Sequence, residues 1–193
     1  MEAPESDAGL WTLANLVSLL RMAAVPVFLW LLLARDDVEG AAVLFLVIGA
    51  TDWVDGRLAR RMGQVSQVGK VLDPLADRLA IVAAVIGGWI AGILPAWFTG
   101  LLLVREAVGL VLGLVLWRKT GKFLVVRRMG KVATFIVYGA IPALYLAAVG
   151  VAPEFLRPAG LAMAAVGLVL YWWVGYRYFL DFRALMNQET ASA

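Results

Sequence analysis

The sequence predicts an all-α, polytopic membrane protein with six transmembrane helices. Hydrophobic residues make up 63% of the 193 residues and charged residues only 16%, with a mean hydropathy of +0.86. Apolar runs of about 20 residues, the length that a helix needs to cross the hydrocarbon core, recur along the chain. The Lys and Arg residues gather in alternate connections between these runs. A soluble domain of this size does not need so much apolar surface.

Each predicted span is one long, mainly apolar run. In chain order the six are Leu13–Ala34, Gly40–Arg60, Gly69–Ala91, Leu94–Trp117, Met129–Val149 and Leu156–Leu180. The first contains one charged residue, Arg21, and is followed by an acidic turn. Several acids interrupt the second and the third, and Arg105 with Glu106 interrupts the fourth. The fifth begins beside a basic segment, and the sixth ends in an aromatic stretch of the kind found at membrane interfaces.

The distribution of basic residues predicts that both termini, and the connection between the second and third spans, lie in the cytosol. The cytosolic set consists of Arg57, Arg60, Arg61, Arg118, Lys119, Lys122, Arg127, Arg128, Lys131, Arg177 and Arg183. Acids at the N-terminus have the wrong sign for a cleaved signal peptide. We therefore expect one multi-pass domain of the cell membrane at residues 10–187, with an N-terminal tail at 1–9 and a C-terminal tail at 188–193.

Composition restricts the chemistry. The chain has no Cys and no His, which excludes thiol nucleophiles, thiolate metal sites and imidazole bases. Any bound metal would then have oxygen ligands, which favours Mg2+ or Mn2+. The net charge of +3 arises mainly on the cytosolic face. It suits anionic membrane lipids and phosphorylated substrates, and we expect no nucleic-acid partner.

Four aspartates interrupt the second and third spans in the pattern D-x2-D-G-x2-A-R-x8-G-x3-D-x3-D. The letters are Asp52, Asp55, Gly56, Ala59, Arg60, Gly69, Asp73 and Asp77. The first group follows i, i+3, i+4 and i+7 spacing and the second i, i+4 and i+8, so each group forms one stripe of a helix. A tight turn between the helices would bring the two acidic stripes together near the membrane boundary.

The energetic cost of these acids predicts a bound cation. An ionised Asp at the centre of a span costs about 2.5–3.5 kcal/mol, so four cost on the order of 10 kcal/mol. One or two divalent cations would cancel the charge, and the small residues of the motif leave room for a ligand near the backbone. Solvation at helix ends, or ion pairs with nearby arginines such as Arg78, is the alternative. It accounts for two acids more easily than for four.

The segment Asp52–Asp77 resembles, at every motif position, the signature of the CDP-alcohol phosphatidyltransferase family. Asn15, Arg21 and Pro26 in the first span, and the segment 73–77, resemble the phosphatidylglycerophosphate synthase branch of that family. The resemblance implies the family's six-helix fold, a homodimer, and transfer of the phosphatidyl group from CDP-diacylglycerol to an alcohol with release of CMP.

The resemblance also implies roles for the motif residues. Asp52, Asp55, Asp73 and Asp77 would bind two divalent cations, Mg2+ or Mn2+. Asp77 would in addition be the base that accepts the proton of the acceptor hydroxyl. The CDP portion of the lipid would be held by Gly56, Ala59, Arg60 and Gly69. Displacement at phosphorus between paired cations agrees with this assignment, and we expect direct attack without a covalent intermediate.

The acceptor's phosphate is predicted to bind Arg105 and Lys131, because guanidinium groups bind phosphate through two hydrogen bonds. A structural ion pair of Arg105 with Glu106 or with a motif aspartate is an equal alternative. Glycerol-phosphate synthases of the family resemble the chain at Arg105-Glu106 and at Gly130-Lys131-x-x-Thr134. Glycerol 3-phosphate is therefore the first expectation for the acceptor.

Two departures from that branch leave a second acceptor open. Residues 107–110 are apolar where such enzymes usually continue with a hydroxyl residue and an Arg, and Val137 stands where they commonly have Gln. A less polar pocket suits a lipid alcohol. The chain also resembles the bacterial cardiolipin synthases that use CDP-diacylglycerol and phosphatidylglycerol.

Two other classes of protein remain open alternatives. A cation transporter would also place acids inside a helix bundle, but such acids are expected near the midplane and on several helices. A structural membrane scaffold would leave the acids unexplained. The clustering on one hairpin favours the enzyme.

Overall fold

The computed structural model describes residues 13–49, 69–120 and 128–192, and every regular element within these ranges is helical. The chain divides into two compact units, residues 1–92 and 93–193. Each unit is described by itself below. The predicted single catalytic domain at residues 10–187 stays a prediction.

In the first unit, helix α1 (Leu13–Leu29) continues into a single π-helical turn, η1 (Trp30–Ala34), and packs against α3 (Gly69–Ile90). A further apolar helix, Val38–Gly49, lies between them in the sequence. Phe28 and Leu32 are almost completely buried. A methyl group at Gly87 of α3 would lie 3.0 Å from a side-chain carbon of Leu32, so the missing side chain allows close packing at this point.

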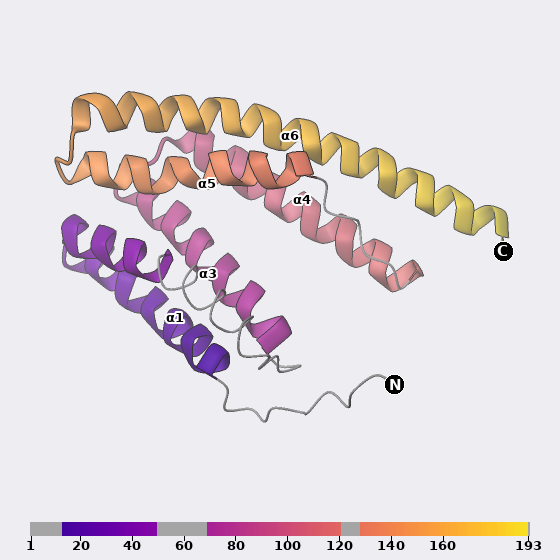
Figure 1. The fold of residues 1–193 in the computed structure, drawn as a ribbon, viewed down its shortest axis with the longest axis horizontal. Coiled ribbons are helices and arrows are strands. Elements are labelled where there is room, and N and C mark those ends of the chain that lie inside the picture. Colours follow the sequence, from indigo (N-terminus) through magenta and orange to yellow (C-terminus); the bar gives the residue numbers. More distant parts are fainter. Residues whose placement is uncertain (1–12, 50–68, 121–127, 193) are drawn as a thin grey trace. The chain divides into compact units, whose positions relative to one another are not determined.

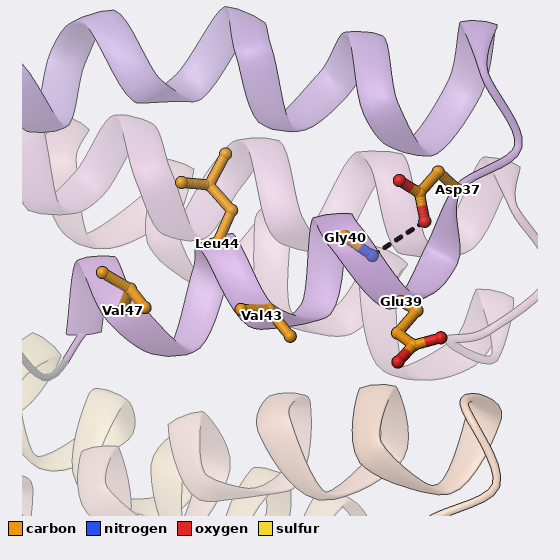
Figure 2. A pocket seen from close by; sticks show the side chains of 6 residues that line it. All are labelled: Asp37, Glu39, Gly40, Val43, Leu44 and Val47. Atoms are coloured by element: carbon orange, nitrogen blue, oxygen red, sulfur yellow. Dashed lines mark hydrogen bonds between the residues drawn. The ribbon is translucent and has the colours of Figure 1, made fainter.

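The connection between η1 and the helix Val38–Gly49 is a tight turn fixed by polar contacts. Asp36 has a φ of 54°, in the left-handed region that Asp tolerates better than most residues. The Asp37 carboxylate accepts a hydrogen bond of 2.8 Å from the Gly40 backbone N–H, which caps the helix (Figure 2). The open groove beside this cap contains none of the residues predicted for catalysis.

In the second unit, α6 (Pro153–Ser192) packs against both α5 (Arg128–Ala148) and α4 (Ala96–Thr120) (Figure 1). The turn between α5 and α6 contains Gly150 and Ala152 at positive φ. Buried side chains of the unit include Phe98, Leu102, Val137, Ile141, Tyr145 and Leu168. Because α6 contacts both other helices, it positions the polar residues that they carry.

The predicted helices agree with the observed ones to within a few residues where the structure describes both ends, except at the C-terminus. There α6 continues to Ser192, through most of the segment expected to be a tail. The second predicted span is described only as far as residue 49. Three described helices are long and apolar enough to cross a membrane, namely Ala96–Lys119, Met129–Ala148 and Pro153–Ala184. The protein is thus an all-helical, multi-pass membrane protein, and the full count of six spans stays a prediction.

Close packing of α5 on α6 leads to a prediction about stability. A methyl group at Gly167 of α6 would lie 2.9 Å from the backbone nitrogen of Val137, an atom that cannot move alone. We expect Gly167→Ala to destabilise the protein by about 1–3 kcal/mol, as overpacking does. Thermal unfolding in detergent measures the effect.

Gly100 of α4 provides the matched control for this substitution. It is exposed, and no atom lies within 4 Å of the position that its methyl group would take. Gly100→Ala should leave the unfolding temperature unchanged or raise it, since Ala favours helix by up to about 1 kcal/mol over Gly. Equal unfolding temperatures for the two variants would contradict the packing argument.

Candidate active site

Five of the predicted site residues lie outside the described part of the chain. They are Asp52, Asp55, Gly56, Ala59 and Arg60, so their roles stay predictions. Gly69, Asp73 and Asp77 lie on α3, which begins at Gly69. Their spacing of four residues places them on one stripe of this helix. The predicted stripe on the third span therefore lies on a continuous helix.

Asp77 forms an ion pair and hydrogen bond with Arg21 of α1. The packing of α1 against α3 brings these two residues together, although 56 positions separate them in the sequence. The Arg21 side chain is 5% exposed, whereas that of Asp77 is 43% exposed. The carboxylate is thus held from one side by a buried cation and remains accessible from the other.

Sequence reasoning named Arg21 but missed its partner. A usable signal was present, because Arg21 is the only charged residue between positions 13 and 34. A lone cation in such an apolar run requires an acid from another helix. The motif aspartates of the next two predicted spans were candidates, but periodicity could not indicate which of them would face α1.

The acids of α3 are of the type that suits a hard divalent cation. Asp73 and Asp77 are four residues apart in this helix. Both are carboxylates, the ligands that Mg2+ and Mn2+ prefer. Among the residues that the structure describes, no group of three acids gathers closely enough to hold a metal. The predicted cation site also includes Asp52 and Asp55, which lie outside the described residues, so it stays a prediction.

A second polar cluster lies between α4 and α6 in the other unit and consists of Arg105, Glu106 and Tyr171. The Arg105 guanidinium carbon lies 3.6 Å from the centre of the Tyr171 ring. The Tyr171 hydroxyl donates a hydrogen bond to Glu106 Oε1, and the same oxygen lies 3.5 Å from Arg105 Nη1. The Arg105 and Glu106 side chains are 13% and 14% exposed. The pairing of Arg105 with Glu106 that the sequence left open is therefore present.

The pairing does not use all the donors of Arg105. Its Nε is buried and has no hydrogen-bond partner among the described residues. Two glycines leave space around the group, since a methyl at Gly109 would lie 3.4 Å from Nη1 and one at Gly175 would lie 3.7 Å from Nε. A buried guanidinium N–H without an acceptor is costly, and a phosphate oxygen would satisfy it.

Lys131 is exposed near the start of α5, and the structure records no contact between it and Arg105. Both residues nevertheless lie at a similar level along α6. Arg105 lies beside Tyr171 and Gly175, whereas a methyl on Gly130 would meet Val174 and Tyr178. The α6 residues beside Arg105 and those beside Gly130 are therefore offset by three positions, or about 4.5 Å along the helix axis. The two positions therefore lie at a similar level along α6, and a shared ligand stays a prediction.

Thr134, which matches the glycerol-phosphate branch, and Val137, which departs from it, both have roles within the helix packing. The Thr134 hydroxyl donates a 2.8 Å hydrogen bond to the Gly130 carbonyl, so it is engaged within its own helix. Val137 is fully buried and lies against Gly167 of α6. Position 137 serves the packing of α5 on α6. By contrast, Val108 and Leu110, which follow Glu106, are exposed apolar side chains.

Comparisons with known proteins show similarity over most of the chain. Residues 11–174 match the family model of the CDP-alcohol phosphatidyltransferases. The chain is 40% identical to the cardiolipin synthase (CMP-forming) of Streptomyces coelicolor over 187 residues, which cover 94% of this chain and 87% of that protein. It is 35% identical to the CDP-diacylglycerol–glycerol-3-phosphate 3-phosphatidyltransferase of Bacillus subtilis over 151 residues, covering 71% of this chain and 78% of that protein.

Proposed function

The chain belongs to the CDP-alcohol phosphatidyltransferase family of membrane enzymes, and from that premise we propose that it is a cardiolipin synthase. It would transfer the phosphatidyl group of CDP-diacylglycerol to phosphatidylglycerol and release CMP. This acceptor was the alternative in the sequence analysis, where glycerol 3-phosphate came first.

The observation that carries the proposal is the likeness to the Streptomyces protein, which extends over 94% of the chain. The likeness to the glycerol-3-phosphate enzyme of Bacillus subtilis is lower in identity and covers 71%. The apolar residues 107–110 support the same choice, since they stand where the glycerol-phosphate branch usually has a hydroxyl residue and an Arg.

The proposed reaction is a displacement at phosphorus. A free hydroxyl of the phosphatidylglycerol headgroup attacks the phosphorus that carries diacylglycerol, forming a new P–O bond. The pyrophosphate P–O bond breaks and CMP leaves with the bonding electron pair. Asp77 takes the proton of the hydroxyl, a role that suits a carboxylate exposed on one side in a chain without His.

The cofactor in this proposal is a pair of divalent cations, Mg2+ or Mn2+, held by Asp52, Asp55, Asp73 and Asp77. Bound there, the cations would neutralise the phosphate oxygens and stabilise the departing CMP. Gly56, Ala59, Arg60 and Gly69 would contact the CDP portion. Arg21 keeps the Asp77 carboxylate in place and compensates its charge before substrate and cations bind.

The phosphate of the acceptor would bind Arg105 and Lys131. The support is the unsatisfied Nε of Arg105, the space left by Gly109 and Gly175, and the similar level of the two cations along α6. We expect the reaction at the cytosolic boundary of the cell membrane, with both termini in the cytosol, because basic residues gather on the predicted cytosolic side.

An acceptor screen tests the proposal. Purified protein is incubated with radiolabelled CDP-diacylglycerol and Mg2+ or Mn2+, together with either phosphatidylglycerol or glycerol 3-phosphate, and the lipids are separated by chromatography. We expect labelled cardiolipin and equimolar CMP with phosphatidylglycerol, and turnover at least about tenfold slower with glycerol 3-phosphate. Phosphatidylglycerophosphate as the main product would instead restore the first expectation. Metal-dependent ion flux in vesicles without CMP release would favour the transporter.

A further inference from the structure

We propose that Tyr171 is a positioning residue, which holds Arg105 in the orientation that binds the acceptor's phosphate. The proposal rests on the proposed function, because it gives Arg105 the acceptor role. Tyr171 lies on α6, in an aromatic stretch that the sequence explains equally well by anchoring at the membrane interface. Its surroundings in the fold differ from those of an anchor, since only 4% of its surface is exposed.

The ring of Tyr171 supports the guanidinium group. The Arg105 guanidinium carbon lies 3.6 Å from the ring centre, within the distance of a stacked cation–π contact. A planar guanidinium stacks well on an aromatic face, which an ammonium group does not do in the same way. The flexible Arg105 side chain is thereby restrained from one side.

The hydroxyl of Tyr171 fixes the same group by a second route. It donates a hydrogen bond to Glu106 Oε1, the oxygen that also lies 3.5 Å from Arg105 Nη1. Tyr171 therefore touches both members of the ion pair. With Glu106 held in this way, its carboxylate restrains Nη1 and leaves Nε without a partner among the described residues.

Two glycines lie beside the guanidinium group of Arg105. Gly109 lies one turn beyond Arg105 on α4, and Gly175 lies one turn beyond Tyr171 on α6. Added methyl groups there would contact the guanidinium at 3.4 and 3.7 Å. The two glycines therefore keep larger side chains away from this group, whose Nε has no partner among the described residues. Tyr171 determines which donors are used by Glu106 and which remain for the acceptor.

The experiment measures KM and kcat separately, in mixed micelles of defined phosphatidylglycerol content. The variants are Arg105→Ala, Tyr171→Leu, which removes ring and hydroxyl, and Tyr171→Phe, which removes the hydroxyl alone and keeps the packing volume. Tyr176→Leu is the control, because Tyr176 lies on the same helix and is 59% exposed. CMP release by the unaltered protein is measured first and tests the transferase function independently.

The expected result is a selective rise in the KM for phosphatidylglycerol. Tyr171→Leu should raise it about tenfold and Tyr171→Phe about threefold, as expected for loss of a cation–π contact and of one hydrogen bond. The kcat and the KM for CDP-diacylglycerol should stay within about twofold, and Tyr176→Leu should match the unaltered protein. In the double variant, Tyr171→Leu should raise the KM for phosphatidylglycerol no further than Arg105→Ala alone, because the guanidinium that Tyr171 positions is absent.

Three results would overturn the proposal. If Arg105→Ala raises the acceptor KM and Tyr171→Leu does not, Arg105 binds the acceptor without help from Tyr171. If both Tyr171 variants raise the KM for phosphatidylglycerol and the KM for CDP-diacylglycerol equally, Tyr171 has only a packing role. The same conclusion follows if the effects of the Tyr171 variants on the KM for phosphatidylglycerol add fully to that of Arg105→Ala. If Arg105→Ala leaves the acceptor KM unchanged while CMP is still released, the acceptor binds elsewhere and the transferase assignment stands without this site.

Discussion

Asp77→Asn should lower kcat by about 10²–10⁴-fold, the range expected for removal of a general base. Asparagine keeps the size of the side chain but cannot accept the proton of the attacking hydroxyl. Binding of CDP-diacylglycerol should remain measurable, since the predicted CDP contacts are other residues. The assay follows CMP release, with binding of labelled CDP-diacylglycerol measured in parallel.

Two controls separate loss of the base from loss of the ion pair. Arg21→Met breaks the contact with Asp77 from the other side and leaves the carboxylate in place. It should therefore reduce turnover much less than Asp77→Asn does. Asp36→Asn should have no effect, because Asp36 is exposed, lies outside the predicted site, and adopts a positive φ that Asn also tolerates. Equal losses in Asp77→Asn and Arg21→Met would mean that Asp77 acts only through the ion pair.

Removal of divalent cations should abolish turnover, and addition of Mg2+ or Mn2+ should restore it. The physical reason is that clustered carboxylates repel one another and need a positive partner near the bilayer. Cation binding should also stabilise the fold without any substrate, by about 2.7 kcal/mol at 100 times the Kd for one site. Thermal unfolding with and without chelator measures this effect independently of activity.

The same unfolding experiment on variants locates the cation. Asp77→Asn should lose much of the cation-dependent rise in unfolding temperature, whereas Asp36→Asn should keep all of it. Full turnover in excess chelator would contradict the proposed cofactor. A rise in unfolding temperature that is unchanged in Asp77→Asn would place the cation at other residues.

The helices were predictable from apolar runs because in a membrane each span must satisfy its own backbone hydrogen bonds. The observed bounds of α3, α4 and α5 accordingly differ from the prediction by three residues or fewer. The C-terminal end of α6 was not predictable in the same way. Beyond Leu180 the apolar run ends, but good helix formers continue, so the helix proceeds to Ser192 without a hydrophobic signal.

Part of the candidate site could be predicted and part could not. The four aspartates and the Arg105–Glu106 step stand out because charges are rare in apolar helices. Tyr171 does not, since an aromatic residue near a span end is expected at any membrane interface. Its role depends on which face of α6 meets α4, and periodicity within α6 alone does not determine that face.

By itself the sequence determined that this is a helical membrane protein, and its acid motif resembled that of the phosphatidyltransferases. Both conclusions rest on local properties, namely run length, charge and spacing along single helices. Only the tertiary structure decided that Arg21 pairs with Asp77 and that Tyr171 joins Arg105 and Glu106. These contacts join residues of different helices: Arg21 and Asp77 are 56 residues apart in the chain, and Glu106 and Tyr171 are 65 residues apart. They depend on how the helices rotate and pack against each other, which small residues and side-chain shapes set jointly.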